Sequence, residues 1–297
     1  MSGRGAAPRP GLLAGKVAFI TGAGRGQGRD LAVRFAQEGA DLVLSDACRD
    51  VDTVRYPMAT SSELDETVRL VEEAGARCVW GQADVRSQSD LDDLTRRAVE
   101  HFGRVDVLLP NAGVFSFAPL WEMSDETWQD MLDITLTGVW RTLKSVAPIM
   151  LENLGGSVVF TSSVNGVEAT AQAAHYVAAK HGVIGLMRNA AVEMGPYGVR
   201  SNALLPGPVD TPMIVNPASR AWVFGRDDAT PEDYDRAMRN WPALRGRGML
   251  PTSAVVDAAT FLASDAARHI SGACIPVDAG HLVLPGFNHN PVLVDVT

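Results

Sequence analysis

Residues 17–28 read VAFITGAGRGQG, and this stretch decides the fold that the sequence predicts. Its first four residues are an apolar run of the kind found in buried strands. Four glycines follow at alternate positions: Gly22, Gly24, Gly26 and Gly28. The apolar residues beyond them have the spacing of a helix. Glycines permit the tight turn from strand to helix and let the backbone approach a pyrophosphate at the helix N-terminus. We therefore expect a nucleotide-binding turn here.

The next apolar run, residues 41–46, ends in the carboxylate of Asp46. Counting from Gly28 gives 46 − 28 = 18, close to the roughly 20 residues expected for the acid that binds the adenosine ribose hydroxyls. An unphosphorylated ribose suits Asp46, whereas a 2′-phosphate would meet a like charge. Arg25 inside the turn argues mildly for NADP, because its cation could bind the 2′-phosphate. Repulsion between that phosphate and Asp46 at contact range outweighs the attraction of an exposed cation. The sequence therefore predicts NAD in preference to NADP.

Strand-like and helix-like stretches alternate over most of the chain. Helices are expected over residues 61–74, 87–102, 125–151 and 172–194. Further strands are expected over residues 78–80, 105–109, 156–163 and 199–205. Alternation of this kind means parallel strands with helices on both faces. We therefore predict an α/β fold, a single-domain, Rossmann-type, doubly wound sheet of about seven strands.

Ligands of such sheets bind beyond the carboxyl ends of the strands. The residues expected at those ends are Asp46, Asp84, Asn111, Ser163 and Pro206.

Size and composition limit the remaining possibilities. The chain has 297 residues, of which 46% are hydrophobic, so it can bury one large core. A formal charge of −9 without a basic cluster argues against a nucleic-acid partner. Three scattered cysteines suit neither a disulfide framework nor a metal site, which favours a reducing cytoplasm and no metal. No apolar run is long enough to cross a bilayer, so no membrane partner is expected.

The domain boundaries follow from the same patterns. We expect residues 1–13 to form a disordered arm, residues 14–284 the domain, and residues 285–297 a tail. Two segments depart from the alternation. Residues 47–60 form a long connection where the adenosine would lie, and residues 206–250 contain six prolines and little clean periodicity. Long irregular stretches in α/β domains are usually lids or substrate loops, and a merely structural excursion is the alternative.

Tyr176 and Lys180, in the run AHYVAAKHG, lie one turn apart on one face of the predicted helix. A free tyrosine has a pKa of about 10, about 3 units above neutrality. Deprotonating it at pH 7 therefore costs roughly 4 kcal/mol. A cation about 4 Å away supplies about that much at an effective dielectric near 20. We therefore expect Lys180 to lower the pKa of Tyr176, which then exchanges a proton with an alcohol oxygen. Such pairs also occur on solvated helix faces, so the prediction depends on the glycine turn.

Together these motifs resemble the short-chain dehydrogenase/reductase family over residues 14–281. The motifs are TGAGRGQG, Asp84-Val85, Asn111-Ala112-Gly113, Ser163, YVAAK, PGPVDT and PVDAG. More narrowly, RGQG, the insert with YPMAT, HYVAAKHGV and TPM resemble an actinobacterial subgroup. That subgroup includes carveol-dehydrogenase-like enzymes linked to the redox carrier mycofactocin, in which NAD is thought to stay bound. Family members are commonly tetramers, so the resemblance implies a homo-oligomer.

The resemblance implies four catalytic positions. Ser163, which precedes Tyr176 by 13 residues as in the family, would hydrogen-bond the substrate oxygen. Tyr176 would exchange the proton, and Lys180 would depress its pKa while bonding the nicotinamide ribose. Thr135 stands where the family usually has an Asn that helps to hold a water between the lysine and solvent. We expect a slower or rewired proton relay from this change, with activity retained.

The resemblance also implies which residues hold NAD, in addition to Tyr176 and Lys180. They are Gly22, Arg25, Gly26, Gln27, Gly28, Asp46, Asp84, Val85, Asn111, Ala112, Gly113, Pro206, Gly207, Val209, Thr211 and Met213.

Substrate contacts are expected from segments that follow the strand ends and from the start of the Tyr176 helix. The candidates are Phe115, Phe117, Val164, Asn165 and Gln172. Most are apolar or aromatic, so a hydrophobic secondary alcohol or ketone, of terpenoid or polyketide type, fits better than a charged metabolite. His175 points about 100° away from Tyr176 around the helix, so we expect it to be a packed or interface residue.

Three functions remain open. The first is an NAD-dependent secondary-alcohol dehydrogenase, and the second is a biosynthetic NAD(P)H-dependent ketoreductase that uses the same site in reverse. The third is a catalytically silent dinucleotide-binding protein. The intact set of Ser163, Tyr176 and Lys180 argues against the third, since a silent protein has no need of all three.

Overall fold

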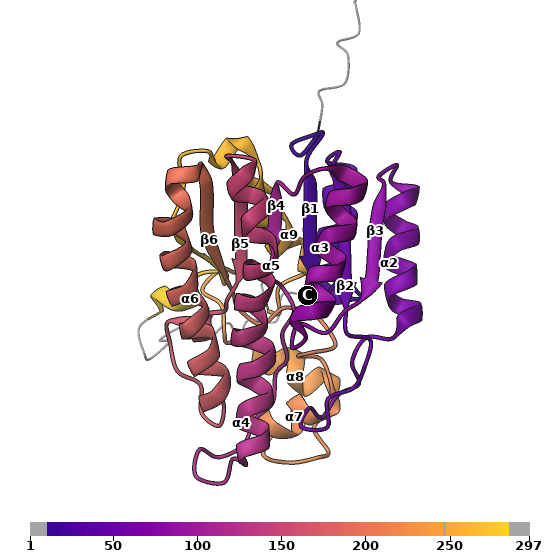
Figure 1. The fold of residues 1–297 in the computed structure, drawn as a ribbon. Coiled ribbons are helices and arrows are strands. Elements are labelled where there is room, and N and C mark those ends of the chain that lie inside the picture. The colour runs from indigo at the N-terminus through magenta and orange to yellow at the C-terminus, as the bar shows by residue number, and fades with distance from the viewer. Residues whose placement is uncertain (1–10, 246–247, 285–297) are drawn as a thin grey trace, which may run out of the picture.

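The computed structural model describes residues 11–245 and 248–284. Its centre is one sheet of seven parallel strands in the order β3-β2-β1-β4-β5-β6-β7 (Figure 1). The strands are β1 (Val17–Thr21), β2 (Asp41–Asp46), β3 (Cys78–Gln82), β4 (Val107–Leu109), β5 (Gly156–Thr161), β6 (Val199–Pro206) and β7 (Cys274–Val277). The strand order reverses between β1 and β4, and the crevice at such a reversal is where doubly wound sheets bind ligands. The predicted architecture is confirmed.

Helices cover both faces of the sheet. On one face lie α1 (Gly26–Gln37), α2 (Ser61–Glu73) and α9 (Thr252–Ala263). On the other, nearer the viewer in Figure 1, lie α3 (Gln88–Phe102), α5 (Gly138–Glu152) and α6 (Ala174–Met194). Alternate residues of each strand serve the two sides, because side chains in a strand point to opposite faces. In β1, for example, Ala18 and Ile20 belong to the first core and Val17 and Phe19 to the second.

The helix expected over residues 125–151 is interrupted. Here α4 (Asp125–Leu132) passes through a π-helical turn, η1 (Asp133–Thr137), into α5. Single π-turns inside α-helices are frequent at functional sites. This one carries Thr135, and Gly138 directly after it lies against Val85, where an added Cβ would come within 2.6 Å of Cγ2. The close approach of the helix to the end of β3 therefore requires a residue without a side chain.

The segment over residues 206–250 is less irregular than expected. It contains α7 (Pro217–Phe224) and α8 (Pro231–Met238), and each has a proline at its first position. The Asn216 and Thr230 side chains cap the two helices by accepting hydrogen bonds from backbone N–H groups. A proline at the first helical position has no intrahelical hydrogen bond to lose, so these prolines begin helices and do not break them.

Short 3₁₀ turns complete the secondary structure, and the start of α6 differs from expectation. The turns are η2 (Val164–Gly166), η3 (Gly195–Tyr197), η4 (Asp265–Ala267) and η5 (His281–Val283). The α6 helix begins at Ala174, not at Gln172, whose φ of 63° lies in the left-handed region.

No helix within residues 11–245 and 248–284 is both long and apolar enough to pass through a membrane.

The N-terminal boundary of the domain also needs correction. Leu13 is fully buried, and its N–H donates to the Glu38 carbonyl at 3.0 Å. An added Cβ at Gly11 would lie 2.2 Å from the same carbonyl oxygen. Residues 11–13 therefore belong to the domain and not to the expected arm. The rest of that arm, residues 1–10, and the tail, residues 285–297, lie outside the described residues.

Candidate active site

A cavity of about 380 Å³ opens at the carboxyl ends of the strands. It extends from Asp46 and Asp84 past the glycine turn to Ser163, Tyr176 and Lys180. All the residues predicted to contact the cofactor line it. Three other candidates, Thr135, Phe117 and Gln172, do not.

The glycine turn between β1 and α1 has the geometry that a diphosphate requires. Gly22 and Gly26 have φ values of 68° and 57°, which other residues rarely adopt. An added Cβ at Gly28 would lie 1.9 Å from the Gly22 carbonyl oxygen. No side chain caps α1 and no acidic residue lies in its first turn, so its N-terminal N–H groups are left for an anion. Within the described residues the buried Oε1 atom of Gln27 also has no hydrogen-bond partner.

Asp46 is held beside this turn at the end of β2. Its Oδ2 accepts a hydrogen bond from the Gly24 N–H at 2.9 Å, and its Oδ1 accepts one from the Cys48 N–H at 3.1 Å. The carboxylate is therefore fixed where ribose hydroxyls can donate to it and a 2′-phosphate would be repelled. Arg25, which argued for NADP, donates to the carbonyl of Pro57 in the connection over residues 47–60.

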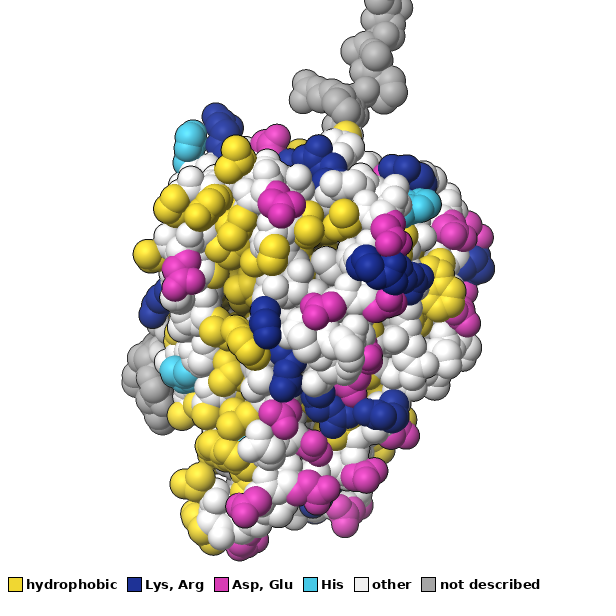
Figure 2. Space-filling model, viewed as in Figure 1, with side chains coloured by type: hydrophobic (Ala, Val, Ile, Leu, Met, Phe, Trp, Pro, Cys, Tyr) yellow, Lys and Arg dark blue, Asp and Glu magenta, His cyan; other side chains and the backbone are white. Residues whose placement is uncertain are grey.

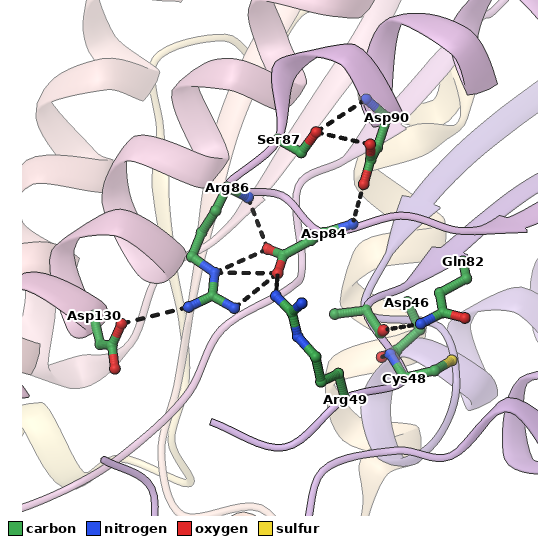
Figure 3. Close-up of polar contacts among 10 residues, drawn as sticks. Asp46, Cys48, Arg49, Gln82, Asp84, Arg86, Ser87, Asp90 and Asp130 are labelled. Carbon is green, nitrogen blue, oxygen red and sulfur yellow. Dashed lines mark hydrogen bonds and ion pairs between the residues drawn. The ribbon is translucent and has the colours of Figure 1, made fainter. Parts of the chain in front are cut away.

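Asp84, at the end of β3, is part of an ion-pair network. Arg86 and Arg49 reach its carboxylate from two sides, each with a nitrogen at 2.8 Å, and Arg86 also contacts Asp130 (Figure 3). Burial alone raises the pKa of Asp84, but hydrogen bonds and charge from Arg86 and Arg49 outweigh it and hold the pKa below its usual value. An adenine base would meet a carboxylate already paired with two guanidinium groups. The adenine contact expected of this side chain stays a prediction.

Ser163, Tyr176 and Lys180 come together at the other end of the cavity. Ser163 follows β5, and its Oγ accepts the Asn165 N–H at 3.2 Å and donates to the Pro206 carbonyl at 3.5 Å. The Ser163 hydroxyl also acts to lower the pKa of the nearby Tyr176 phenol. One turn along α6, the Lys180 ammonium lies 5.5 Å from the centre of the Tyr176 ring and donates to the Thr161 carbonyl at 2.8 Å.

Burial sets the acidity of this pair, contrary to the prediction from spacing. It raises the pKa of Tyr176 to about 12, against a smaller opposing effect of the Ser163 hydroxyl. It also lowers the pKa of Lys180 to about 8. The expectation that Lys180 lowers the pKa of Tyr176 is therefore wrong for the protein alone. The physical reason is that loss of hydration disfavours the charged form of both groups, while the ammonium is directed at a backbone carbonyl.

Thr135 lies behind the catalytic groups. It is fully buried in η1, and its Oγ1 accepts the Val114 N–H at 3.4 Å and donates to the Met131 sulfur at 3.4 Å. A Cβ built on Gly113 would lie 3.7 Å from both Thr135 Oγ1 and Lys180 Nζ. The hydroxyl and the ammonium therefore face one another across a glycine.

Aromatic rings form one wall of the catalytic end. Phe115 packs edge-on against Tyr176, with ring centres 5.0 Å apart, and its ring lies 5.7 Å from Trp222 of α7. Phe117 stacks on the outer side of Trp222 at 5.2 Å and so supports the wall without lining the cavity. The Gln172 side chain is exposed, so the structure does not bring this predicted substrate contact to the cavity.

His175 has the packing role that was expected. It is fully buried, and its Nε2 lies 2.8 Å from the Ser116 hydroxyl. This contact ties α6 to the segment after β4.

Three residues in contact at the far side of the cavity were not predicted from the sequence: Glu168, Trp241 and His281. His281 Nε2 lies 3.0 Å from Glu168 Oε2, and Nδ1 lies 3.1 Å from the Trp241 carbonyl. The two ring nitrogens thus face two oxygen atoms from different segments of the chain. The Trp241 indole stacks on His281 at 3.7 Å and covers Gly207, where an added Cβ would lie 2.2 Å from it. The unusual length of the 206–250 segment was the only signal in the sequence.

Metal ligation has no support in the described part of the chain, where no group of three His, Cys, Asp or Glu side chains is arranged to hold an ion. The three cysteines are free.

Comparison with known proteins finds a matching family model and several relatives. The family model for short chain dehydrogenase matches residues 16–221. The (-)-trans-carveol dehydrogenase of Rhodococcus erythropolis is 46% identical over 272 residues, which cover 90% of this chain and 97% of that protein. A Mycobacterium tuberculosis protein named as an uncharacterized NAD-dependent oxidoreductase is 42% identical over 276 residues, covering 92% and 98% of the two chains.

Solved structures agree with these relatives. The carveol dehydrogenase of Mycobacterium avium in complex with NAD has a TM-score of 0.89 and is 44% identical, covering 92% of this chain and 99% of that one. A short chain dehydrogenase of Mycobacterium paratuberculosis bound to NAD has a TM-score of 0.84 at 38% identity, covering 91% and 99%.

Proposed function

The chain belongs to the short-chain dehydrogenase family and is an NAD-dependent oxidoreductase, and we propose that it interconverts a hydrophobic secondary alcohol and its ketone. One observation carries the proposal. Ser163 and Tyr176 lie at the aromatic end of a cavity whose other end has the glycine turn and Asp46. One continuous site would therefore hold a proton-exchanging group, an apolar wall for the substrate and a place for a dinucleotide.

The residues of this chain have separable tasks in that reaction. The N-terminus of α1 and the glycine turn would hold the pyrophosphate, and Asp46 would accept from the adenosine ribose. NAD, when bound, supplies the carbon that accepts or returns the hydride. Ser163 donates to the substrate oxygen and so fixes its place, while Tyr176 takes the alcohol proton in one direction and returns it in the other. Lys180, which does not lower the pKa of Tyr176 in the protein alone, would bond the nicotinamide ribose when NAD is present.

Thr135 supports the proton path in this proposal. Its hydroxyl faces Lys180 across Gly113, where a water bonded to both would connect the ammonium with the interior of α4. A threonine offers a single hydroxyl where an asparagine offers an amide, so we expect a slower relay and retained activity.

The direction of the reaction has two candidates. The relatives named as carveol dehydrogenases favour alcohol oxidation. The raised pKa of Tyr176 favours ketone reduction as the second candidate, because a phenol with a pKa of about 12 carries the proton that a ketone oxygen needs. The lining of the catalytic end, with Val114, Phe115 and Trp222, favours a neutral ring compound of terpenoid or polyketide type in either direction.

We propose further that NAD stays bound and is reoxidised by a mycofactocin-type carrier. Support comes from the resemblance to that subgroup and from the connection over residues 47–60. This connection lines the adenosine half of the cavity with Arg49, Val51 and Ala59, and the Arg49–Asp84 ion pair joins it to the end of β3. Exit of a nucleotide would require these contacts to open.

A homo-oligomer, with a tetramer as the expected state, completes the proposal. Figure 2 shows hydrophobic side chains gathered over the face on which α4, α5 and α6 lie. Two of the exposed hydrophobic residues in this part of the fold are large, Trp128 on α4 and Trp140 on α5. Apolar surface of this kind marks interfaces more often than free surface.

The test is to purify the protein, identify its bound nucleotide and measure alcohol oxidation. We expect co-purified NAD, slow turnover with added NAD, and faster turnover with an artificial electron acceptor. Ready exchange of added NADPH with efficient ketone reduction would instead establish the ketoreductase. Failure to convert any member of a broad panel of alcohols and ketones would contradict both.

A further inference from the structure

The connection over residues 47–60 extends beyond the adenosine side and reaches the substrate wall. Its Tyr56 side chain is 9% exposed and lines the cavity. The Tyr56 hydroxyl accepts a hydrogen bond from the Phe115 N–H at 3.1 Å. Phe115 is the residue whose ring packs edge-on against Tyr176 at 5.0 Å. The Tyr56 hydroxyl therefore links the segment over residues 47–60 to Phe115, whose ring lies beside the Tyr176 phenol.

Other contacts hold the same wall from a different side. The Val114 N–H donates to Thr135 at 3.4 Å, the Ser116 hydroxyl lies 2.8 Å from His175, and the Ala118 N–H donates to the Gln172 carbonyl at 2.9 Å. These partners come from η1, from α6 and from the residues that lead into α6. Phe115, by contrast, is held from the connection over residues 47–60. Its backbone position therefore depends on that connection as well as on the catalytic helix.

The connection itself is tied to the glycine turn beside Tyr56. The carbonyl of Pro57, the next residue, accepts a hydrogen bond from the Arg25 guanidinium. Ala59 lies against the turn as well, because a Cβ added at Gly24 would come within 2.7 Å of the Ala59 Cβ. The glycine turn therefore contacts Pro57 and Ala59 of the connection, and the connection contacts the substrate wall through Tyr56.

We infer that Tyr56 is a positioning residue for the reaction and a determinant of the preference for ring-shaped substrates. Its hydroxyl fixes the Phe115 amide, the Phe115 ring fixes the gap beside Tyr176, and that gap selects substrates broad enough to fill it. A small acyclic alcohol touches little of this wall and depends on Ser163 and Tyr176 alone. The inference rests on the proposed function, since it assumes that Tyr176 exchanges its proton with an alcohol.

The experiment is Tyr56→Phe, which removes the hydroxyl and keeps the ring. The Phe115 N–H then loses its partner in a buried place, and the segment shifts to find another. We expect kcat/KM for carveol to fall at least about tenfold and that for 2-butanol to fall less than about threefold, so that their ratio drops. Bound NAD should be unchanged. Tyr197→Phe is the matched control, because the same hydroxyl is removed from an exposed ring in η3 and the ratio should stay as in the wild type.

A second variant tests the same wall without Tyr56. Phe115→Leu should lower the carveol to 2-butanol ratio, and adding Tyr56→Phe to it should lower the ratio little further, because both act through one ring. If Tyr56→Phe does not fold, the ratio in Phe115→Leu decides. An unchanged ratio in either variant, or an equal loss for both alcohols, would overturn the inference even if the melting temperature fell. If the wild type oxidises neither alcohol, a cyclic and an acyclic alcohol that it does convert replace them. Conversion of no alcohol or ketone at all would refute the proposed function, and this inference with it.

Discussion

The two ends of the cavity treat charge in opposite ways. At the adenosine end, Asp84 lies between the guanidinium groups of Arg49 and Arg86, and Asp46 accepts two backbone hydrogen bonds. At the catalytic end, Lys180 is 4% exposed and its ammonium donates a hydrogen bond to the neutral Thr161 carbonyl. One end pairs its charges in contact with solvent, and the other buries a cation among aromatic and aliphatic groups.

The difference shows where reactivity is located. Opposite charges hold the pKa of Asp84 below its usual value, so a fixed carboxylate that favours its ionised form lies at the adenosine end. Burial without a counter-charge brings the pKa of Lys180 to about 8 and that of Tyr176 to about 12. Groups whose proton affinity has been displaced in this way are typical of catalytic sites. The four changes below test this division, from the largest expected effect to the smallest.

Tyr176→Phe should have the largest effect, because it removes the proton donor and acceptor and keeps the packing against Phe115. We expect turnover to fall about 10²–10⁴-fold, the range typical of general acid–base groups. Nucleotide binding should be unchanged, since the adenosine end is untouched. Steady-state rates and bound NAD measured on the same preparation provide the check, and residual activity above about a tenth of the wild type would contradict the proton-transfer role.

Lys180 should make the stability of the nucleotide-free protein depend on pH. The ammonium has a folded-state pKa of about 8 against an ordinary lysine pKa of 10.5, so between these values the unfolded chain binds one proton more than the folded chain. The free energy of unfolding therefore rises with pH in that window, by roughly 3 kcal/mol in all. Below about pH 8 the whole penalty is present.

Urea unfolding at pH 7 and at pH 9.5 checks this prediction. Lys180→Met should be more stable than the wild type at pH 7, be inactive, and lack most of the rise. Lys144→Met, which removes an exposed ammonium from α5, should keep the rise. Equal slopes in the wild type and Lys180→Met would show that burial does not set the acidity of the catalytic end.

Asp46→Ala sharpens the comparison at the adenosine end. It removes a charged acceptor for the ribose hydroxyls, which is worth about 1.5–3 kcal/mol or roughly 10–100-fold in affinity for NAD. It also removes the like charge that opposes a 2′-phosphate, so the preference for NAD over NADP should narrow. Calorimetric titration of nucleotide-free protein with both cofactors gives the answer, with the exposed Asp52 changed to Ala as the control. An unchanged preference would assign cofactor choice to another group.

Arg49→Gln should have the smallest effect. The Arg49 side chain is 65% exposed, and ion pairs at that exposure typically contribute less than about 1 kcal/mol. Asp84 keeps Arg86, so the fold should be unaffected and NAD release should accelerate only a few-fold. Stopped-flow release at low and high salt is the measurement. A loss of stability larger than that of Asp46→Ala would mean that the adenosine end depends on this pair far more than its exposure indicates.

Much of the fold and of the site could be predicted because its signals are local. Apolar runs and helical periodicity identified strands and helices, and parallel strands bring residues that follow each strand to one edge. Asp46, Ser163 and Tyr176 were therefore assigned to one cavity before their distances were known. The error over residues 206–250 was also local in origin: six prolines and weak periodicity predicted an irregular segment, although Pro217 and Pro231 each begin a helix.

What the sequence by itself determined is the doubly wound sheet, the glycine turn and the residues at the strand ends, because spacing along the chain decides all three. The tertiary structure alone decided the direction of the Tyr176 pKa shift, the reach of Tyr56 to Phe115, and the contact of His281 with Glu168 across 113 residues of chain. Acidity depends on how much water a fold removes, and these contacts depend on which distant segments it brings together. Neither quantity is encoded in the spacing of neighbouring residues.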